Sequence, residues 1–514
     1  MNTPIPHPSP NLLHRRDFLK GVSAGALTLT CLPVLSADNS ETRATSWTDA
    51  YGLTRLGTVK TKSAKEIKSS PLSVGMECLD RRMYSPERTY EGLAALGVKW
   101  ARVQTGWSRC ETERETYDFG WLDEVVDSIL KTGVQPWFNL GYGNRLYTPA
   151  APDVSAVGWA PIDSDAARQG WVRFVAALAH HFRTRVRHWE IWNEANISHF
   201  WQPTKSSPAG YMDLVKLTAP VIRRRIPDVV LIGGAFSGMP AEFLKGCLEQ
   251  GLADHVQKIS YHPYVLIPEQ GYASALADWR KMVARFNPSV TLWQGECGCP
   301  SSQGGVGALA QHNWNEQRQA KWLLRRTLLD LGQGLELISY FHMVDLVNYQ
   351  WAGKTVLLDQ AEKPRTSFRA DFGLLRGDDY SVKPSYRAYQ RLCSLFDAQT
   401  KRADLAASFA GKEATGHADN IVQACFVRGQ HPLYTYWLPE DVQKDSPAQA
   451  VAATIHIKQD LTLREPVLVD LLTGDINRLP GEQKAGEWTF TTLPVADYPL
   501  LLTDAAAAIP GRRS

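Results

Sequence analysis

Two glutamates, Glu194 and Glu296, each end a strand-like apolar run, and they are 296 − 194 = 102 residues apart. The runs are His188-Trp189-Glu190-Ile191-Trp192-Asn193-Glu194 and Thr291-Leu292-Trp293-Gln294-Gly295-Glu296. They count as the fourth and seventh strands of a series in which strands and helices alternate. Two carboxyl groups on one barrel rim can cleave a glycosidic bond, since one protonates the leaving oxygen while the other attacks the anomeric carbon. Two unrelated surface acids are the alternative, but the flanking Trp and Asn residues and the strand positions favour catalysis.

The composition is that of a soluble globular protein, with 44% hydrophobic and 21% charged residues in 514. This length exceeds one ordinary domain, although an α/β barrel can account for much of it. A net charge of only +3 points neither to nucleic acid nor to an acidic membrane as a partner. The 17 tryptophans suit the apolar faces of sugars, although most of them will be core. We expect a carbohydrate as the partner and no cofactor, and the oligomeric state is not predicted.

The first 37 residues have the features of an export signal. The segment His14-Arg15-Arg16-Asp17-Phe18-Leu19-Lys20 is similar to the twin-arginine motif, and an apolar stretch over 21–35 follows. Pro33 interrupts that stretch, which is too short to span a bilayer comfortably, and Ser36-Ala37 offers a cleavage site. We therefore expect a twin-arginine signal peptide over 1–37 and a periplasmic or secreted protein without a membrane span after its removal. A disordered basic tail or an uncleaved anchor is the alternative.

Seven cysteines remain after the predicted signal. They are Cys78, Cys110, Cys247, Cys297, Cys299, Cys393 and Cys425. An odd number leaves at least one thiol free in an oxidising compartment. Cys78 and Cys110 follow neighbouring predicted strands, which leaves a disulfide between them open. Cys297 and Cys299 could form half of a metal site, but no partner with the usual ligand spacing is nearby, so we expect no metal.

Between residues 70 and 396, strand-like runs alternate with amphipathic stretches that carry apolar residues three and four positions apart. The predicted strands are Leu72–Cys78, Val98–Trp107, Val134–Tyr142, Val186–Glu194, Val229–Phe236, Lys258–Val265, Val290–Glu296 and Leu335–His342. Eight repeats of strand and helix predict a closed (β/α)8 barrel. An open doubly wound sheet would usually need a Gly-rich phosphate loop after its first strand, and Gly75-Met76-Glu77-Cys78 is not one.

After Phe396 the pattern changes to short strand-like segments separated by turn residues. These segments are Ile421–Val427, Leu433–Trp437, Ala452–Ile457, Val467–Leu471, Trp488–Thr492 and Leu500–Leu502. They predict a small antiparallel β-sandwich over 397–505. We interpret it as a buttress for the barrel, with sugar binding as the alternative. Residues 38–69 hold few apolar positions and are predicted to be an N-terminal arm.

In such a barrel the active site lies at the carboxyl ends of the strands, so polar residues near those ends should converge. The residues at these ends are Arg102 and Trp107 on the second strand, Asn139, Tyr142 and Asn144 on the third, Glu190, Asn193 and Glu194 on the fourth, His262 and Tyr264 on the sixth, and Glu296 on the seventh. Acids, bases and hydrogen-bond donors of this kind suit a polyhydroxylated ligand.

The two glutamates need different charge states for their roles. Alternation along the fourth strand predicts that Glu190, Trp192 and Glu194 lie on one side. A carboxylate deep in a barrel must be paired, and Arg102, two strands away, can pair with Glu190 or with Glu296. A cation beside Glu296 would keep it ionised, as a nucleophile requires, whereas Glu194 must stay protonated to act as an acid. A purely structural ion pair is the alternative role for Arg102.

The fourth strand carries a family resemblance. The segment Trp189-Glu190-Ile191-Trp192-Asn193-Glu194-Ala195-Asn196, followed by Phe200-Trp201, resembles the fourth-strand motif of (β/α)8 retaining glycosidases. The resemblance is closest to glycoside hydrolase family 39, which contains β-xylosidases and α-L-iduronidases, and it covers roughly residues 72–396. It implies that Glu194 is the acid/base and Glu296 the nucleophile, and that Asn193 binds the sugar 2-hydroxyl.

Other strands match the family less closely. Tyr261-His262-Pro263-Tyr264 resembles the sixth-strand motif, whose His or Tyr contacts substrate or nucleophile. The seventh strand is closer to the broader superfamily than to the xylosidases. On the eighth, Phe341 stands where a sugar-stacking tryptophan is common, and Trp351 or Trp314 could replace it, with simple packing as the alternative for both. The residues we expect to bind substrate are Asn193, Asn139, His262, Tyr264, Arg102, Trp107, Trp201 and Trp351.

We therefore expect a retaining glycoside hydrolase that cleaves O-glycosidic bonds of oligo- or polysaccharides, with β-xylosidase-like substrates favoured. A transglycosylase would use the same site, and a non-catalytic carbohydrate-binding barrel is the alternative from another class. A metal-dependent hydrolase would need His or Asp clusters at the strand ends, and His262 with His342 are too few. The sugar, the linkage and exo or endo action depend on loops and are not predicted.

Overall fold

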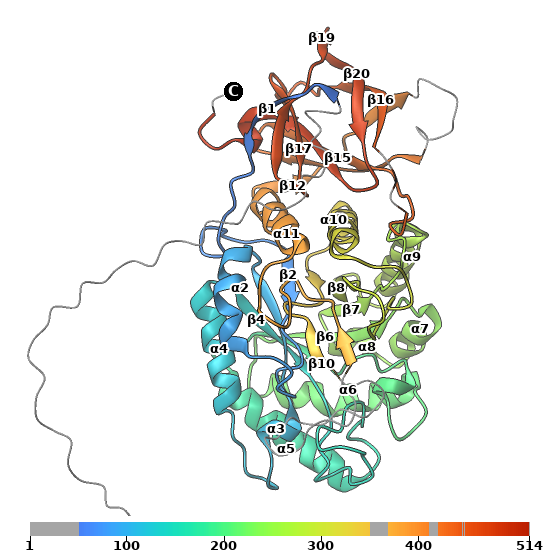
Figure 1. Ribbon diagram of the computed structural model, residues 1–514. Helices are drawn as coiled ribbons and strands as arrows, with labels where there is room; N and C mark the ends of the chain where they lie inside the picture. Colours follow the sequence, from blue (N-terminus) through green and yellow to red (C-terminus); the bar gives the residue numbers. More distant parts are fainter. Residues whose placement is uncertain (1–50, 350–367, 411–419, 445, 447, 513–514) are drawn as a thin grey trace, which may run out of the picture. The chain divides into compact units, whose positions relative to one another are not determined.

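A closed barrel of eight parallel strands forms the centre of the computed structural model (Figure 1). The structure describes residues 51–349, 368–410, 420–444, 446 and 448–512. The barrel strands are β2 (Leu72–Gly75), β3 (Trp100–Gln104), β4 (Gln135–Leu140), β5 (His188–Ile191), β6 (Val230–Ser237), β7 (Lys258–His262), β8 (Thr291–Cys297) and β9 (Ile338–Tyr340). All eight predicted strands are thus confirmed, and with them the (β/α)8 fold.

Strand β9 closes the barrel, because it pairs in parallel with both β8 and β2. Every other barrel strand pairs in parallel with its neighbours in the chain. All carboxyl ends therefore lie on one rim. Strands β5 and β8, which precede Glu194 and carry Glu296, are the fourth and seventh strands of the barrel.

Helices connect successive strands. They are α2 (Tyr90–Leu96), α3 (Trp107–Cys110), α4 (Gly120–Thr132), α5 (Asp165–Phe182), α6 (Pro208–Arg223), α7 (Ala241–Glu249), α8 (Leu252–His255), α9 (Tyr272–Ala284), α10 (Glu316–Gly332) and α11 (Pro384–Leu395). Helices α5, α6 and α10 begin where the side chains of Ser164, Ser207 and Asn315 accept a hydrogen bond from a backbone N–H of the first turn. Such caps satisfy donors that a helix start leaves unpaired.

The C-terminal region forms two antiparallel sheets, as predicted. The seven-stranded sheet contains β1 (Thr54–Thr58), β18 (Asp475–Arg478), β17 (Pro466–Asp470), β21 (Leu500–Asp504), β15 (His431–Trp437), β14 (Val422–Arg428) and β12 (Thr400–Arg402). The four-stranded sheet contains β13 (Ala407–Ala410), β16 (Gln449–His456), β20 (Glu487–Val495) and β19 (Glu482–Lys484). A short pair, β10 (Leu346–Tyr349) and β11 (Phe368–Ala370), follows the last barrel strand.

The predicted N-terminal arm contains a strand that the sequence analysis did not anticipate. Strand β1 pairs antiparallel with β18, and its blue arrow lies among the red strands in Figure 1. Its sequence, Thr-Arg-Leu-Gly-Thr, has one large apolar residue and a glycine, and it is an edge strand with mostly exposed or half-buried residues. A strand stabilised by pairing alone leaves little periodic signal.

A buried ion pair of the barrel, between Arg325 and Glu269, is contacted by the sandwich through Trp437. Arg325 on α10 donates two hydrogen bonds to Glu269, at 2.9 and 2.6 Å. The indole Nε1 of Trp437 on β15 donates to the same carboxylate, at 2.6 Å. These contacts favour the interpretation of the sandwich as a buttress. Among the described residues, no helix is long and apolar enough to cross a membrane.

All seven cysteines outside the predicted signal are free and buried. The disulfide that the sequence left open between Cys78 and Cys110 does not form. The Cys78 Sγ instead accepts a hydrogen bond from Arg81 at 3.1 Å, and the Cys110 thiol donates to the carbonyl of Thr105 at 3.3 Å.

Candidate active site

The backbone leaves strand geometry before it reaches Glu194. Strand β5 ends at Ile191, and Trp192 and Glu194 have φ values of 69° and 47°, in the left-handed region. The Glu194 N–H donates to the carbonyl of Ala235 at 2.7 Å, beside a register shift in β6. Irregular backbone of this kind is common next to active sites, where it redirects a side chain.

This turn overrides the predicted alternation. Glu190 lies in the barrel interior, fully buried. The Trp192 indole instead packs against Trp171 of helix α5, with ring centroids 6.1 Å apart, and donates to the Phe200 carbonyl at 2.8 Å. The prediction that Glu190, Trp192 and Glu194 share one side is therefore wrong for Trp192, because the period of two ends with the strand.

Glu296 is held by two neighbours at the end of β8. The Tyr264 hydroxyl donates to its Oε1 at 2.7 Å, and Arg102 Nη1 donates to its Oε2. The Glu296 side chain is 13% exposed, which leaves one edge open at the rim. The structure thus brings Tyr264 and Arg102 to Glu296, as the sequence predicts.

The two glutamates face each other across a histidine. Oxygen atoms of Glu194 and Glu296 and a ring nitrogen of His262 all lie within 4.8 Å of one another. The His262 Nδ1 is 2.8 Å from Glu194 Oε1 and 3.8 Å from Glu296 Oε2. His262 is fully buried, so it contacts the predicted acid/base and offers no exposed surface to a substrate.

Arg102 binds several side chains of the site at once. Its guanidinium makes five hydrogen bonds, equal to its number of N–H donors. Two go to Glu190, at 2.9 and 2.6 Å, one to Glu77 at 3.1 Å, one to Asn193 Oδ1 at 2.8 Å and one to Glu296. The side chain has no exposed surface, so replacing Arg102 would leave the buried Glu190 carboxyl without its cation.

The surroundings of Glu194 and Glu296 shift the pKa values of the two carboxyl groups in opposite directions. Burial raises the pKa of the Glu194 carboxyl, and the charge of Glu296 adds to that rise, although His262 opposes it. Burial acts in the same direction on Glu296, but His262, Arg102 and the Tyr264 hydroxyl outweigh it, so the pKa of Glu296 lies below its usual value. Glu296 is therefore poised as an anion and Glu194 as a proton carrier.

Three further residues, Ser260, Glu77 and His342, shape the floor of the site, and none of them was predicted from the sequence to belong to it. Ser260 donates to Glu190 Oε1, and Asn139, which was predicted, donates to Glu190 Oε2 at 2.8 Å. Glu77 follows the first strand, and burial raises its pKa to about 8. His342 follows the eighth strand and lies 3.1 Å from the Glu77 carbonyl, and burial lowers its pKa to about 4. Glu77 and His342 follow the ends of the first and eighth strands, and this position is the signal that could have assigned them to the site.

The tryptophans predicted to contact substrate do not line the site in the described part of the chain. Trp107 is fully buried, stacked on Tyr147 at 5.0 Å, and belongs to helix α3 instead of a strand end. Trp201 is fully buried against Trp192, and Trp314 is 2% exposed. The structure therefore does not bring these tryptophans to the carboxyl groups, because they fill spaces between barrel and helices. Trp351 lies outside the described residues.

The donor atoms of Glu194, His262 and Glu296 are close enough to be considered as metal ligands. Arg102 Nη1, however, donates to Glu296 Oε2, and His262 Nδ1 already hydrogen-bonds Glu194. A divalent cation at this point would face a permanent guanidinium charge bound to one of its own ligand oxygens. The donor set fits proton transfer better than metal binding.

A closed parallel barrel with paired glutamates at the ends of its fourth and seventh strands has the architecture of the (β/α)8 glycoside hydrolases. Comparison with known proteins agrees. The model of glycosyl hydrolases family 39 matches residues 79–288. A β-xylosidase from Geobacillus stearothermophilus is 28% identical over 160 residues, which are 29% of this chain and 31% of that relative. The match thus spans less than a third of the curated relative.

Solved structures extend the likeness over most of the chain. A family 39 glycoside hydrolase from Bacteroides cellulosilyticus WH2 is 21% identical with a TM-score of 0.62, covering 86% of this chain and 82% of that one. A monomeric β-xylosidase from Caulobacter crescentus CB15 is 16% identical with a TM-score of 0.57, covering 88% and 99%. The protein therefore has a (β/α)8 fold with an appended β-sandwich and is similar to family 39 glycosyl hydrolases.

Proposed function

We propose that this protein is a retaining glycoside hydrolase that cleaves O-glycosidic bonds by double displacement. The observation that carries the proposal is the spacing of its carboxyl groups, since oxygens of Glu194 and Glu296 lie within 4.8 Å of each other. Retaining enzymes separate these groups by about 5–5.5 Å, whereas inverting enzymes need about 6.5–9.5 Å to admit a water between them.

In the first step, ionised Glu296 attacks the anomeric carbon. The bond to the leaving oxygen breaks, and Glu194 gives its proton to that oxygen. Arg102 and Tyr264 hold the Glu296 carboxylate by hydrogen bonds to separate oxygens, which fixes its direction of attack and keeps it ionised. The product of this step is a covalent ester between the sugar and Glu296.

In the second step, Glu194, now a carboxylate, removes a proton from water. The resulting attack on the anomeric carbon breaks the ester to Glu296 and returns both carboxyl groups to their first state. His262, 2.8 Å from Glu194 Oε1, stabilises the negative charge that Glu194 carries between the steps.

Asn193 can bind the sugar in both steps. Its Oδ1 accepts from Arg102, which leaves its Nδ2 to donate to the sugar 2-hydroxyl.

Among substrates, β-xylosides are favoured, because relatives in sequence and in fold are named β-xylosidases. The test is a panel of aryl β-glycosides beginning with xyloside, glucoside, galactoside and arabinoside, followed by proton NMR of the first sugar released. Release with the anomeric configuration of the substrate supports the proposal, and release with the opposite configuration refutes it. Sugar–sugar products in place of free sugar would identify a transglycosylase.

We also propose that the protein is exported through the twin-arginine pathway to the periplasm or medium. The support is the Arg15-Arg16 motif and the apolar stretch that follows it. Fractionation of cells that produce the full chain tests this, because an enzyme that stays in the cytoplasm would contradict it.

A further inference from the structure

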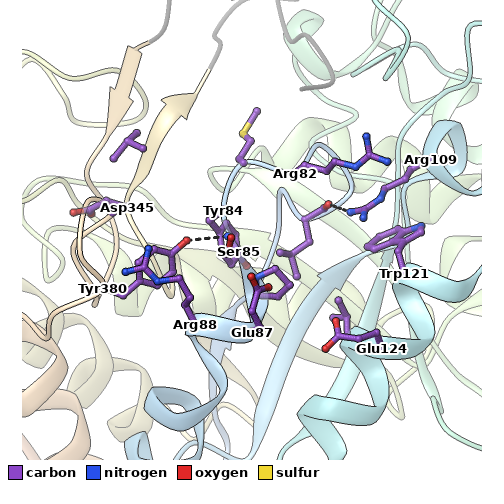
Figure 2. A pocket seen from close by; sticks show the side chains of 16 residues that line it. Arg82, Tyr84, Ser85, Glu87, Arg88, Arg109, Trp121, Glu124, Asp345 and Tyr380 are labelled. Carbon is purple, nitrogen blue, oxygen red and sulfur yellow. Dashed lines mark hydrogen bonds between the residues drawn. The ribbon is translucent and has the colours of Figure 1, made fainter. Parts of the chain in front are cut away.

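A pocket lies apart from the catalytic glutamates. It has a volume of about 530 Å³ and is walled by the segment that follows β2, by residues around α3 and α4, and by residues near β10 and Tyr380 (Figure 2). That volume is within the range of about 300–1,000 Å³ that small-molecule sites occupy. Neither Glu194 nor Glu296 lines it.

Positive charge without a carboxylate partner gathers in this pocket. Three arginines line it, Arg82, Arg88 and Arg109, and none of them is within ion-pair distance of an acidic side chain in the described part of the chain. Burial and the nearby charge of Arg82 lower the pKa of Arg109 to about 10, although the more distant charges of Asp80 and Asp118 oppose this shift. Two cations that repel each other in one wall make a site that favours an anion.

The arginines are held in place by aromatic rings. The Arg109 guanidinium lies 4.2 Å from the ring centre of Trp121 and donates to the Leu79 carbonyl. The Arg88 guanidinium lies 3.9 Å from the ring centre of Tyr380. Such stacking fixes a guanidinium while its edge remains able to donate.

The pocket also contains a buried hydroxyl without a partner. The Tyr84 hydroxyl makes no hydrogen bond with any described residue, and Tyr84 is only 8% exposed. Buried donors are normally satisfied, and an unsatisfied one costs about 1–3 kcal/mol of stability. Tyr84 lines the same pocket as the arginines, so a ligand there would offer its hydroxyl a partner.

The acidic residues of the pocket suit sugar hydroxyls. Asp345 is neutralised by Lys383, 2.6 Å away. Glu124 accepts hydrogen bonds from Tyr90 and Ser128, and Glu87 is exposed. In Figure 2, Glu87 and Glu124 lie away from Arg82 and Arg109. A ligand with an anionic group at one end and hydroxyls at the other would use both sides, whereas a simple inorganic anion would use only one.

We propose that this pocket binds a sugar unit that carries a negative charge, a carboxylate or a sulfate ester, as an accessory site beside the catalytic centre. Its position supports this, because Tyr84 contacts the ring of His342 at 5.3 Å, and His342 in turn lies 3.1 Å from the Glu77 carbonyl at the floor of the active site. The choice of a sugar rests on the proposed function, whereas the choice of an anion rests on the pocket alone.

Isothermal titration calorimetry of the full mature chain at low salt tests the proposal with three probes: D-glucuronate, D-glucose and inorganic sulfate. Glucuronate and glucose differ only in the carboxylate, and neither has a glycosidic bond, so turnover cannot contribute heat. We expect glucuronate to bind at least about tenfold more tightly than glucose or sulfate. Arg82→Gln and Arg109→Gln should each weaken glucuronate binding about tenfold.

Arg225→Gln is the matched control. It removes the same charge from an exposed arginine before β6, at the opposite end of the barrel, and should leave glucuronate binding unchanged. Arg82 is itself exposed, so its variant should fold even if Arg109→Gln does not. Equal binding of glucuronate and glucose, or unchanged binding in Arg82→Gln, would overturn the proposal. Sulfate that binds as tightly as glucuronate would overturn the sugar assignment. Hydrolysis of neutral aryl glycosides tests the proposed function separately.

Discussion

Replacing Tyr264 by phenylalanine removes the hydroxyl that donates to Glu296 Oε1 across 2.7 Å and leaves the aromatic ring in place. A hydrogen bond to a charged group contributes about 1.5–3 kcal/mol. The Glu296 side chain is 13% exposed, so water can replace the lost donor only in part. One pKa unit corresponds to about 1.4 kcal/mol, and the pKa of Glu296 should therefore rise by about 1–2 units.

The acidic limb of the pH profile follows the ionisation of Glu296. The tyrosine stabilises the anion and lowers the pKa of Glu296, and only the anion can attack. In Tyr264→Phe the acidic limb of the kcat/KM profile should move to higher pH by about 1–2 units, and activity at low pH should fall most. The assay measures kcat/KM for an activated aryl glycoside from about pH 4 to about pH 9.

Tyr261→Phe is the matched control, because this tyrosine lies on β7, three residues before Tyr264, and its hydroxyl hydrogen-bonds Tyr272 at 2.6 Å instead of a catalytic group. It should lower stability without moving the acidic limb. An acidic limb that stays where it is in Tyr264→Phe, or that moves equally in Tyr261→Phe, would show that the Tyr264 hydroxyl does not set the pKa of Glu296.

Further predictions concern other parts of the chain. Glu194→Ala should slow substrates with poor leaving groups far more than activated ones, and azide should restore turnover as a glycosyl azide; equal losses on both kinds of substrate would count against its role as the acid. Asn193→Ala should lower kcat and kcat/KM together by about 2–4 kcal/mol of transition-state stabilisation, as steady-state kinetics would show, whereas a rise in KM alone would make Asn193 a simple binding group. Burial raises the pKa of Glu77 to about 8, so its contribution to stability is lost as the pH rises towards 8, and Glu77→Gln should raise Tm by a few degrees at pH 8 relative to wild type and less at pH 5. Replacing Arg15-Arg16 by two lysines should keep the protein in the cytoplasm, and unchanged export would contradict the twin-arginine proposal.

The barrel was predictable from the sequence because its signal is repeated eight times. Each strand is a short apolar run, and each helix has a period near 3.6, so errors of a few residues at the ends do not change the count. Strand β1 was missed for the opposite reason, since its residues are mostly exposed and only pairing with β18 makes it a strand. Long-range pairing of this kind leaves no local pattern.

Within the site, residue types were easier to predict than contacts. The carboxyl pair follows from two strand ends, and the contacts of Arg102 with Glu190 and Glu296 follow from the need to pair buried charges. The contact of His262 with Glu194 depends on the left-handed turn after β5, which redirects the glutamate and cannot be derived from strand alternation. The tryptophans were overestimated as sugar platforms, because a large ring serves the core as readily as it serves a ligand.

The proposed double displacement requires Glu296 to be the nucleophile. Incubation with an activated 2-deoxy-2-fluoro-glycoside of a sugar that the enzyme accepts should accumulate the glycosyl-enzyme, because the fluorine slows both steps while the activated leaving group keeps formation faster than hydrolysis. Peptide mapping by mass spectrometry then locates the added sugar. We expect one sugar on the peptide that contains Glu296 and none in Glu296→Ala. A label on another carboxyl group, or turnover without any covalent adduct, would contradict this assignment.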